Sequence, residues 1–200
     1  MYSGVSKGFR LMFYSGIALL ICPLLGVLFA FPLFAVPFVV IVKLACGIVS
    51  WVGIYKVSAS LKDAKPAFVL AIINTVVSFI QKNISGLSFT YIILGIAGTV
   101  LAASVIYYIV KVTSSELAKN GNSDMERKGN VIWILCLVVS GVTALVYLPI
   151  MLRLVGAYAQ LFTMLASIVG LVMEILYLIY LYSAGKAFDE LNLETDCEPV

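Results

Sequence analysis

Hydrophobic residues run through the chain in long stretches, and short polar segments separate these stretches. Stretches of about 20 apolar residues without a period-two alternation are typical of helices that cross roughly 30 Å of hydrocarbon. The pattern predicts an all-α, polytopic membrane protein with six transmembrane helices, paired along the chain as three hairpins. The predicted spans are residues 10–31, 36–55, 66–81, 89–110, 131–152 and 157–182.

The polar segments predict two longer loops on one side of the bundle and short turns on the other. Residues 56–65 and 111–130 form these loops, and the second is rich in Ser, Asn, Gly and charge. We expect helical extensions at the ends of this second loop. Residues 183–200 form a polar and acidic tail, a composition that favours a solvated segment. Because six spans leave no room for a separate soluble domain, we expect residues 1–200 to form a single membrane domain.

The basic residues predict an orientation. Of the 13 lysine and arginine residues, ten lie on the side that holds both termini of a six-span chain. Lys82 and Arg153 lie on the opposite side, and Lys43 lies inside a span. Since cytoplasmic loops carry an excess of Lys and Arg, we expect a cell-membrane protein with both termini in the cytoplasm. The ten residues are Lys7, Arg10, Lys56, Lys62, Lys65, Lys111, Lys119, Arg127, Lys128 and Lys186.

Composition narrows the possible functions. The chain is 62% apolar and 12% charged, with a mean hydropathy of +1.11, whereas soluble domains are about 45–50% apolar and about 25% charged. The charges are too dispersed for a nucleic-acid footprint, so we expect the lipid bilayer as a partner and no nucleic acid. The chain has no histidine, which excludes His-dependent triads and His-ligated zinc or haem.

The cysteines indicate no further functional site. The chain has four cysteines, and their spacing matches neither a zinc site nor a disulfide framework. Three of them, Cys22, Cys46 and Cys136, lie inside apolar runs, as small core residues do. We therefore expect no catalytic residues, no metal and no cofactor, and a protein that is not an enzyme.

Two ionisable residues, Lys43 and Glu174, lie inside predicted spans. A lysine at the centre of a membrane helix costs roughly 2.5–3.5 kcal/mol, so each charge needs a partner, water or neutralisation. The two spans run in the same direction, and helix rise places the two residues roughly 8 Å apart along the membrane normal. Both side chains lean toward the outer surface, so a direct ion pair requires Lys43 to fold back or a water to bridge.

Three interpretations of these residues stay open. The first is the direct pair. In the second, Lys43 extends into an outward-facing polar vestibule, while Glu174 is protonated or is held by Asn74, Gln160 or a tyrosine. In the third, Lys43 contacts an anionic ligand or Glu174 couples to proton movement.

The outer end of the last span is predicted to form the entrance of a ligand or ion pathway. Gln160 lies there with Arg153 beside it, as an entrance or as interfacial anchors. The candidate residues of a ligand or ion pathway are therefore Lys43, Glu174, Asn74, Gln160 and Arg153.

Two functional hypotheses follow. The first is a non-enzymatic subunit or accessory protein that acts through another membrane protein or as a homo-oligomer, because the residues of most reactive sites are missing. The second is a small-molecule transporter, or a ligand-binding component of one, with an outward-facing pocket near Lys43. The size and six-span plan are similar to those of the substrate-binding subunits of energy-coupling vitamin transporters. None of the residue signatures of that family occurs here, so the resemblance concerns architecture alone.

Overall fold

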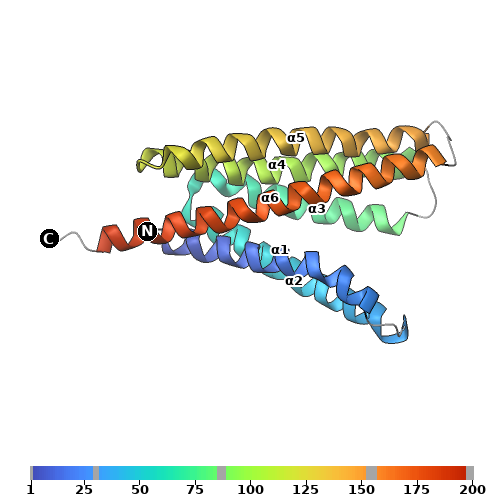
Figure 1. Cartoon of the computed structure of the whole chain (residues 1–200), viewed down its shortest axis with the longest axis horizontal. Helices are drawn as coiled ribbons and strands as arrows, with labels where there is room; N and C mark the ends of the chain where they lie inside the picture. Colours follow the sequence, from blue (N-terminus) through green and yellow to red (C-terminus); the bar gives the residue numbers. More distant parts are fainter. Residues whose placement is uncertain (1, 29–31, 85–88, 152–156, 197–200) are drawn as a thin grey trace. The chain divides into compact units, whose positions relative to one another are not determined.

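The computed structural model describes residues 2–28, 32–84, 89–151 and 157–196, which are almost entirely helical (Figure 1). Within these residues six helices are long and apolar enough to cross a membrane. The all-α class and the six apolar helices predicted from the sequence are therefore confirmed. The helices are α1 (Ser3–Leu28), α2 (Pro32–Ser60), α3 (Lys65–Asn83), α4 (Phe89–Lys119), α5 (Ser123–Met151) and α6 (Ala157–Asp196), with a 3-10 turn at Lys62–Ala64 before α3.

Several helices continue well beyond the apolar spans. The segment 111–130, which the sequence predicts to be a loop with helical extensions at its ends, is helical except for a short connection between Lys119 and Ser123. The segment 183–196 of the predicted tail continues α6 as a helix. The physical reason is that an established helix gains one backbone hydrogen bond for each residue added, whether that residue is apolar or polar.

A compact motif joins α4 to α5. The N–H of Asn122 donates to the Leu117 carbonyl oxygen at 3.0 Å, and the N–H of Gly121 donates to the Ala118 carbonyl oxygen at 3.0 Å. This pair of bonds is the Schellman arrangement, which requires a left-handed residue after the helix. Gly121 supplies it, with φ of 88°. The connection is therefore an ordered turn that holds the two helices antiparallel.

Gly121→Ala should weaken this turn. An L side chain in the left-handed region costs about 1–2 kcal/mol, and Gly121 faces open space, so backbone strain is the only effect expected. Hydrogen–deuterium exchange at the ends of α4 and α5 should become faster. Gly141→Ala, within α5 and also facing open space, is the control and should leave exchange there unchanged. Equal exchange in the two variants would contradict the prediction.

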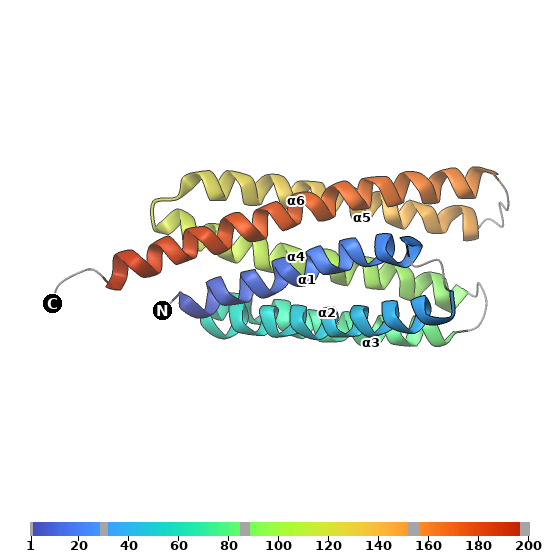
Figure 2. The ribbon, with the colours of Figure 1, turned by 60° about the horizontal axis from the view of Figure 1, so that its bottom comes forward.

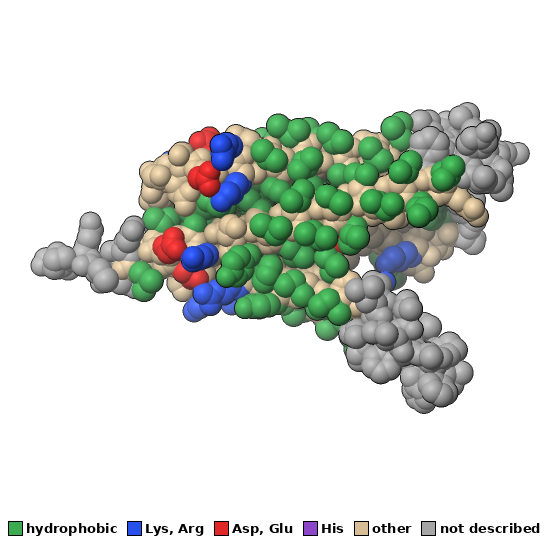
Figure 3. Space-filling model, viewed as in Figure 1, with side chains coloured by type: hydrophobic (Ala, Val, Ile, Leu, Met, Phe, Trp, Pro, Cys, Tyr) green, Lys and Arg blue, Asp and Glu red, His purple; other side chains and the backbone are tan. Residues whose placement is uncertain are grey.

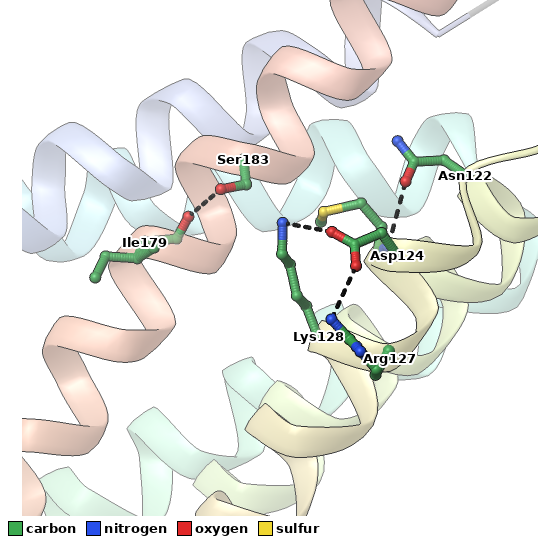
Figure 4. A network of polar contacts seen from close by, with 7 residues as sticks. Asn122, Asp124, Arg127, Lys128, Ile179 and Ser183 are labelled. Carbon is green, nitrogen blue, oxygen red and sulfur yellow. Dashed lines mark hydrogen bonds and ion pairs between the residues drawn. The ribbon is translucent and has the colours of Figure 1, made fainter.

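The first turn of α5 has its own capping groups. The Asn122 Oδ1 accepts from the backbone N–H of Met125 at 3.2 Å, as an N-cap does. Asp124 accepts from Arg127 at 3.3 Å and from Lys128 at 2.9 Å (Figure 4). These side chains are exposed, so the ion pairs add little stability. The Asp124 carboxylate also lies at the positive end of the helix dipole, which favours the start of α5 here.

The chain forms two compact units. The first contains α1, α2 and the part of α6 that begins at Leu178, and the second contains α3, α4, α5 and the part of α6 that ends at Tyr177. In both views α1 lies along α2 in the first unit (Figures 1 and 2). In the second unit α4 packs against both α3 and α5.

In the first unit, glycine brings the backbones of α1 and α2 into contact. A Cβ atom on Gly8 would lie 2.7 Å from the Gly53 carbonyl oxygen, and one on Gly53 would lie 2.8 Å from the Gly8 carbonyl oxygen. Gly4 lies one turn before Gly8 and faces the Ser60 side chain. Small residues four apart permit this close approach in membrane helices, where van der Waals packing drives association.

In the second unit, aromatic and polar side chains connect α4 to its neighbours. The rings of Tyr107 and Trp133 lie 4.4 Å apart between centroids and join α4 to α5. On the other side of α4, the Gln81 Nε2 donates to the Tyr91 carbonyl oxygen at 3.3 Å. A Cβ atom on Gly129 would lie 2.7 Å from the Ser114 Cβ atom, so α4 and α5 also approach closely.

The surfaces of the helices are largely apolar. On the face shown in Figure 3, hydrophobic side chains cover the helices and charged side chains gather near helix ends. The large side chains of Ile41, Leu44, Phe79 and Met164 are each more than 60% exposed. An apolar surface of this extent suits contact with lipid and fits a multi-pass membrane protein.

Candidate functional site

The structure places Lys43 and Glu174 in different units. Lys43 lies on α2 in the first unit and is exposed, and Glu174 lies on α6 in the second unit and is exposed. Among the described residues, neither side chain forms an ion pair within its own unit. Their mutual pairing stays a prediction.

Asn74 is the third predicted pathway residue, and it faces α4. A Cβ atom on Gly98 would lie 3.6 Å from the Asn74 Oδ1. This oxygen is buried and has no hydrogen-bond partner among the described residues. A glycine opposite the amide therefore gives it room in the α3–α4 contact, so within the second unit Asn74 is a helix-contact residue.

The remaining two predicted residues are Gln160, near the start of α6, and Arg153. Gln160 is exposed. Arg153 lies outside the described residues, so the predicted entrance made by these two side chains stays a prediction.

Where α6 packs on α1, the described residues form a cluster of polar and charged side chains. This cluster contains none of the five predicted pathway residues. Phe188 is fully buried there, with its ring centroid 6.0 Å from that of Phe9 and 5.4 Å from that of Tyr2. Further along the same contact, Gly16 lies against Leu178 and Gly185 lies against Phe9. These contacts show that α1 and α6 run antiparallel in the first unit.

Asp189 fixes the register of this contact. Its carboxylate accepts from the Ser6 hydroxyl at 2.5 Å and from the Arg10 guanidinium at 2.5 Å. Ser6 is buried, whereas the Arg10 side chain is 63% exposed. Lys186 and Glu190, on the same helix, form a longer ion pair of 3.8 Å. The arrangement therefore combines a half-buried carboxylate with two cations that still reach water.

A cavity of about 340 Å³ opens beside these charges, and we refer to it as the α1–α6 cavity. Its lining divides into three charged side chains, three aromatic rings and two small or aliphatic residues. The Phe13 and Tyr182 rings lie 5.3 Å apart, and the Phe13 and Tyr14 rings lie 5.5 Å apart. The lining residues are Arg10, Phe13, Tyr14, Leu181, Tyr182, Gly185, Lys186 and Asp189.

The sequence analysis did not identify this cluster, because it treated 183–200 as a solvated tail. The signal that could have found it is the spacing of Leu181, Ala184, Phe188 and Leu191, which is that of one helix face. Leu181, Ala184 and Phe188 are buried in the structure. A buried face needs a partner helix, and α1 provides it.

The described residues contain no group of three or more Cys, Asp or Glu side chains that could hold a metal ion. The cysteines Cys22, Cys46 and Cys136 are buried and free. Several hydroxyls bond to carbonyl oxygens of their own helix, for example Thr75 to Ala71 and Thr143 to Val139. Such bonds satisfy a hydroxyl inside an apolar helix without a partner elsewhere.

Comparison of the chain with protein-family models, with curated proteins and with solved structures finds no match. The functional argument therefore depends on the residues and contacts described above.

Proposed function

We propose that the protein is a non-enzymatic membrane subunit that acts by binding other membrane helices, from a different protein or from a second copy of itself. In this proposal the six helices cross the cell membrane as three hairpins, with both termini in the cytoplasm. The distribution of basic residues along the sequence supports this orientation, because ten of 13 fall on the side of the termini.

The observation that carries the proposal is the position of Lys43. It is exposed on α2, and the neighbouring Ile41, Leu44 and Ile48 are 65%, 64% and 64% exposed. An ammonium group on such an apolar surface would face hydrocarbon, at a cost of roughly 2.5–3.5 kcal/mol near the bilayer centre. A partner helix that brings a carboxylate or a carbonyl oxygen to Lys43 removes this cost.

The surface beside Lys43 also has room for a helix. Gly47 lies one turn further along α2, and a Cβ atom there would meet nothing within 4 Å. Residues four apart share a helix face, so the cation and the open glycine lie together. Close backbone approach at glycine is how membrane helices commonly associate.

Lys43→Met tests the proposal. Blue-native electrophoresis of mild detergent extracts should show the unaltered protein in a complex larger than one chain. In the variant the amount of that complex should fall at least about tenfold, because a desolvated charge pair loses one of its two partners. Lys82→Met, which removes an exposed lysine at the end of α3, is the control and should leave the complex intact.

Two outcomes would contradict the proposal. One is that the unaltered protein is a single monodisperse chain in these extracts. The other is that Lys43→Met and Glu174→Gln each lower the stability of the monomer and do not change its assembly, which is the result expected if these two residues satisfy each other.

The alternative function is a small-molecule transporter or ligand-binding transport component with a pocket near Lys43. The α1–α6 cavity does not include Lys43. Gly53 contacts Met12 at the level of that cavity, and ten residues of helix separate Lys43 from Gly53, which is about 15 Å. That cavity is therefore not the pocket of this alternative. Uptake of a candidate substrate that is abolished by Lys43→Met but unaffected by Lys82→Met would favour the transporter.

A further inference from the structure

The α1–α6 cavity has charges at one end and aromatic rings at the other. Along α1, Phe13 and Tyr14 follow Arg10 toward the apolar part of the helix. Along α6, which runs in the opposite direction, Tyr182 lies about one turn on the apolar side of Lys186. The polarity of the lining therefore changes in the same direction on both helices.

We propose that this cavity binds an anionic phospholipid, with the headgroup phosphate between Arg10 and Lys186 and the glycerol and upper acyl chains against Tyr14 and Tyr182. Basic pockets between membrane helices recognise anionic headgroups, and tyrosine is enriched at the same depth of the bilayer. This proposal is independent of whether Lys43 binds a partner helix.

The two cations keep hydrogen-bond donors available for a phosphate. One terminal nitrogen of Arg10 donates to Asp189, and a guanidinium has five N–H donors. The Lys186 ammonium lies 3.8 Å from the Glu190 carboxylate, and it has three donors. Their side chains are 63% and 68% exposed, so both reach solvent and headgroups. Asp189, which also accepts from the Ser6 hydroxyl, orients Arg10 without occupying all of its donors.

The aromatic end of the cavity favours a lipid over free phosphate. A free anion needs only the charged end, whereas Phe13, Tyr14 and Tyr182 provide a wall for apolar atoms next to it. The volume of about 340 Å³ lies at the lower end of the range for small-molecule sites, about 300–1,000 Å³, and exceeds what a phosphate alone requires.

Native mass spectrometry of the detergent-solubilised full chain tests the proposal, with phosphatidylglycerol and phosphatidylcholine as probes. The unaltered protein should retain phosphatidylglycerol in preference to phosphatidylcholine. Lys186→Gln should lower phosphatidylglycerol affinity about fivefold, the change expected for one cation near an anionic headgroup. Lys186→Arg should preserve binding, because it keeps the charge.

Lys128→Gln is the matched control, since Lys128 is an exposed helical lysine paired with Asp124 four residues away, as Lys186 is with Glu190. It should bind phosphatidylglycerol as the unaltered protein does. Equal loss in the two glutamine variants, or equal retention of the two lipids, would overturn the proposal. Displacement of the lipid by millimolar inorganic phosphate would overturn it too, because it would show a simple anion site.

Discussion

Gly53→Ala is expected to separate α1 from α2. The new Cβ atom would lie 2.8 Å from the Gly8 carbonyl oxygen and 2.6 Å from the Met12 Cγ atom. The Met12 side chain can move aside, but the carbonyl oxygen moves only with its helix. Overpacking of this kind costs about 1–3 kcal/mol, which exceeds the gain of about 1 kcal/mol that alanine brings to a helix. The free energy of unfolding in mixed SDS micelles should fall accordingly.

Gly47→Ala is the control for this prediction, because Gly47 lies on the same helix and a Cβ atom there meets nothing within 4 Å. It should leave the free energy of unfolding unchanged or raise it slightly through helix propensity. If both alanine variants are equally stable, the close approach of α1 and α2 at Gly8 and Gly53 does not exist in the folded protein.

Phe188→Ala should have the largest effect on stability. The side chain is 0% exposed and contacts the rings of Phe9 and Tyr2. Replacing a buried phenylalanine with alanine typically costs about 3–5 kcal/mol, because the lost apolar contacts leave a cavity. The same unfolding measurement should show this loss, and protease cleavage within residues 183–196 should increase as the end of α6 leaves α1.

Leu193→Ala is the matched change on the same helix, where the leucine is 66% exposed. It should alter the free energy of unfolding by no more than about 0.5 kcal/mol, as surface substitutions do. Indistinguishable stability and cleavage of the two variants would show that the end of α6 is a solvated tail, as the sequence analysis expected.

Lys43 and Asp189 differ in how much the sequence alone reveals about them. Lys43 was recognisable as a candidate because a cation in an apolar run is exceptional whatever surrounds it. Asp189 was not, because an acidic residue near the end of a chain is usually solvated. Its partners Ser6 and Arg10 lie more than 170 positions away in the sequence, and no local pattern reports such a pairing.

Local sequence also does not show which glycines lie at a helix contact. The sequence alone does not distinguish the roles of Gly8, Gly47 and Gly53. Gly8 and Gly53 meet backbone carbonyl oxygens, whereas Gly47 faces open space. Only the rotation and register of α1 against α2 distinguish a glycine that a helix contact requires from one that it does not.

The sequence by itself determined the all-helical class and the number of apolar helices, because hydrophobicity and helix formation are properties of neighbouring residues. It also singled out Lys43 and Glu174. The tertiary structure alone decided that residues 183–196 continue α6, that Asp189 joins Ser6 to Arg10, and that a cavity lies beside them. These features depend on which faces of distant helices meet, and that choice is made by packing over the whole first unit.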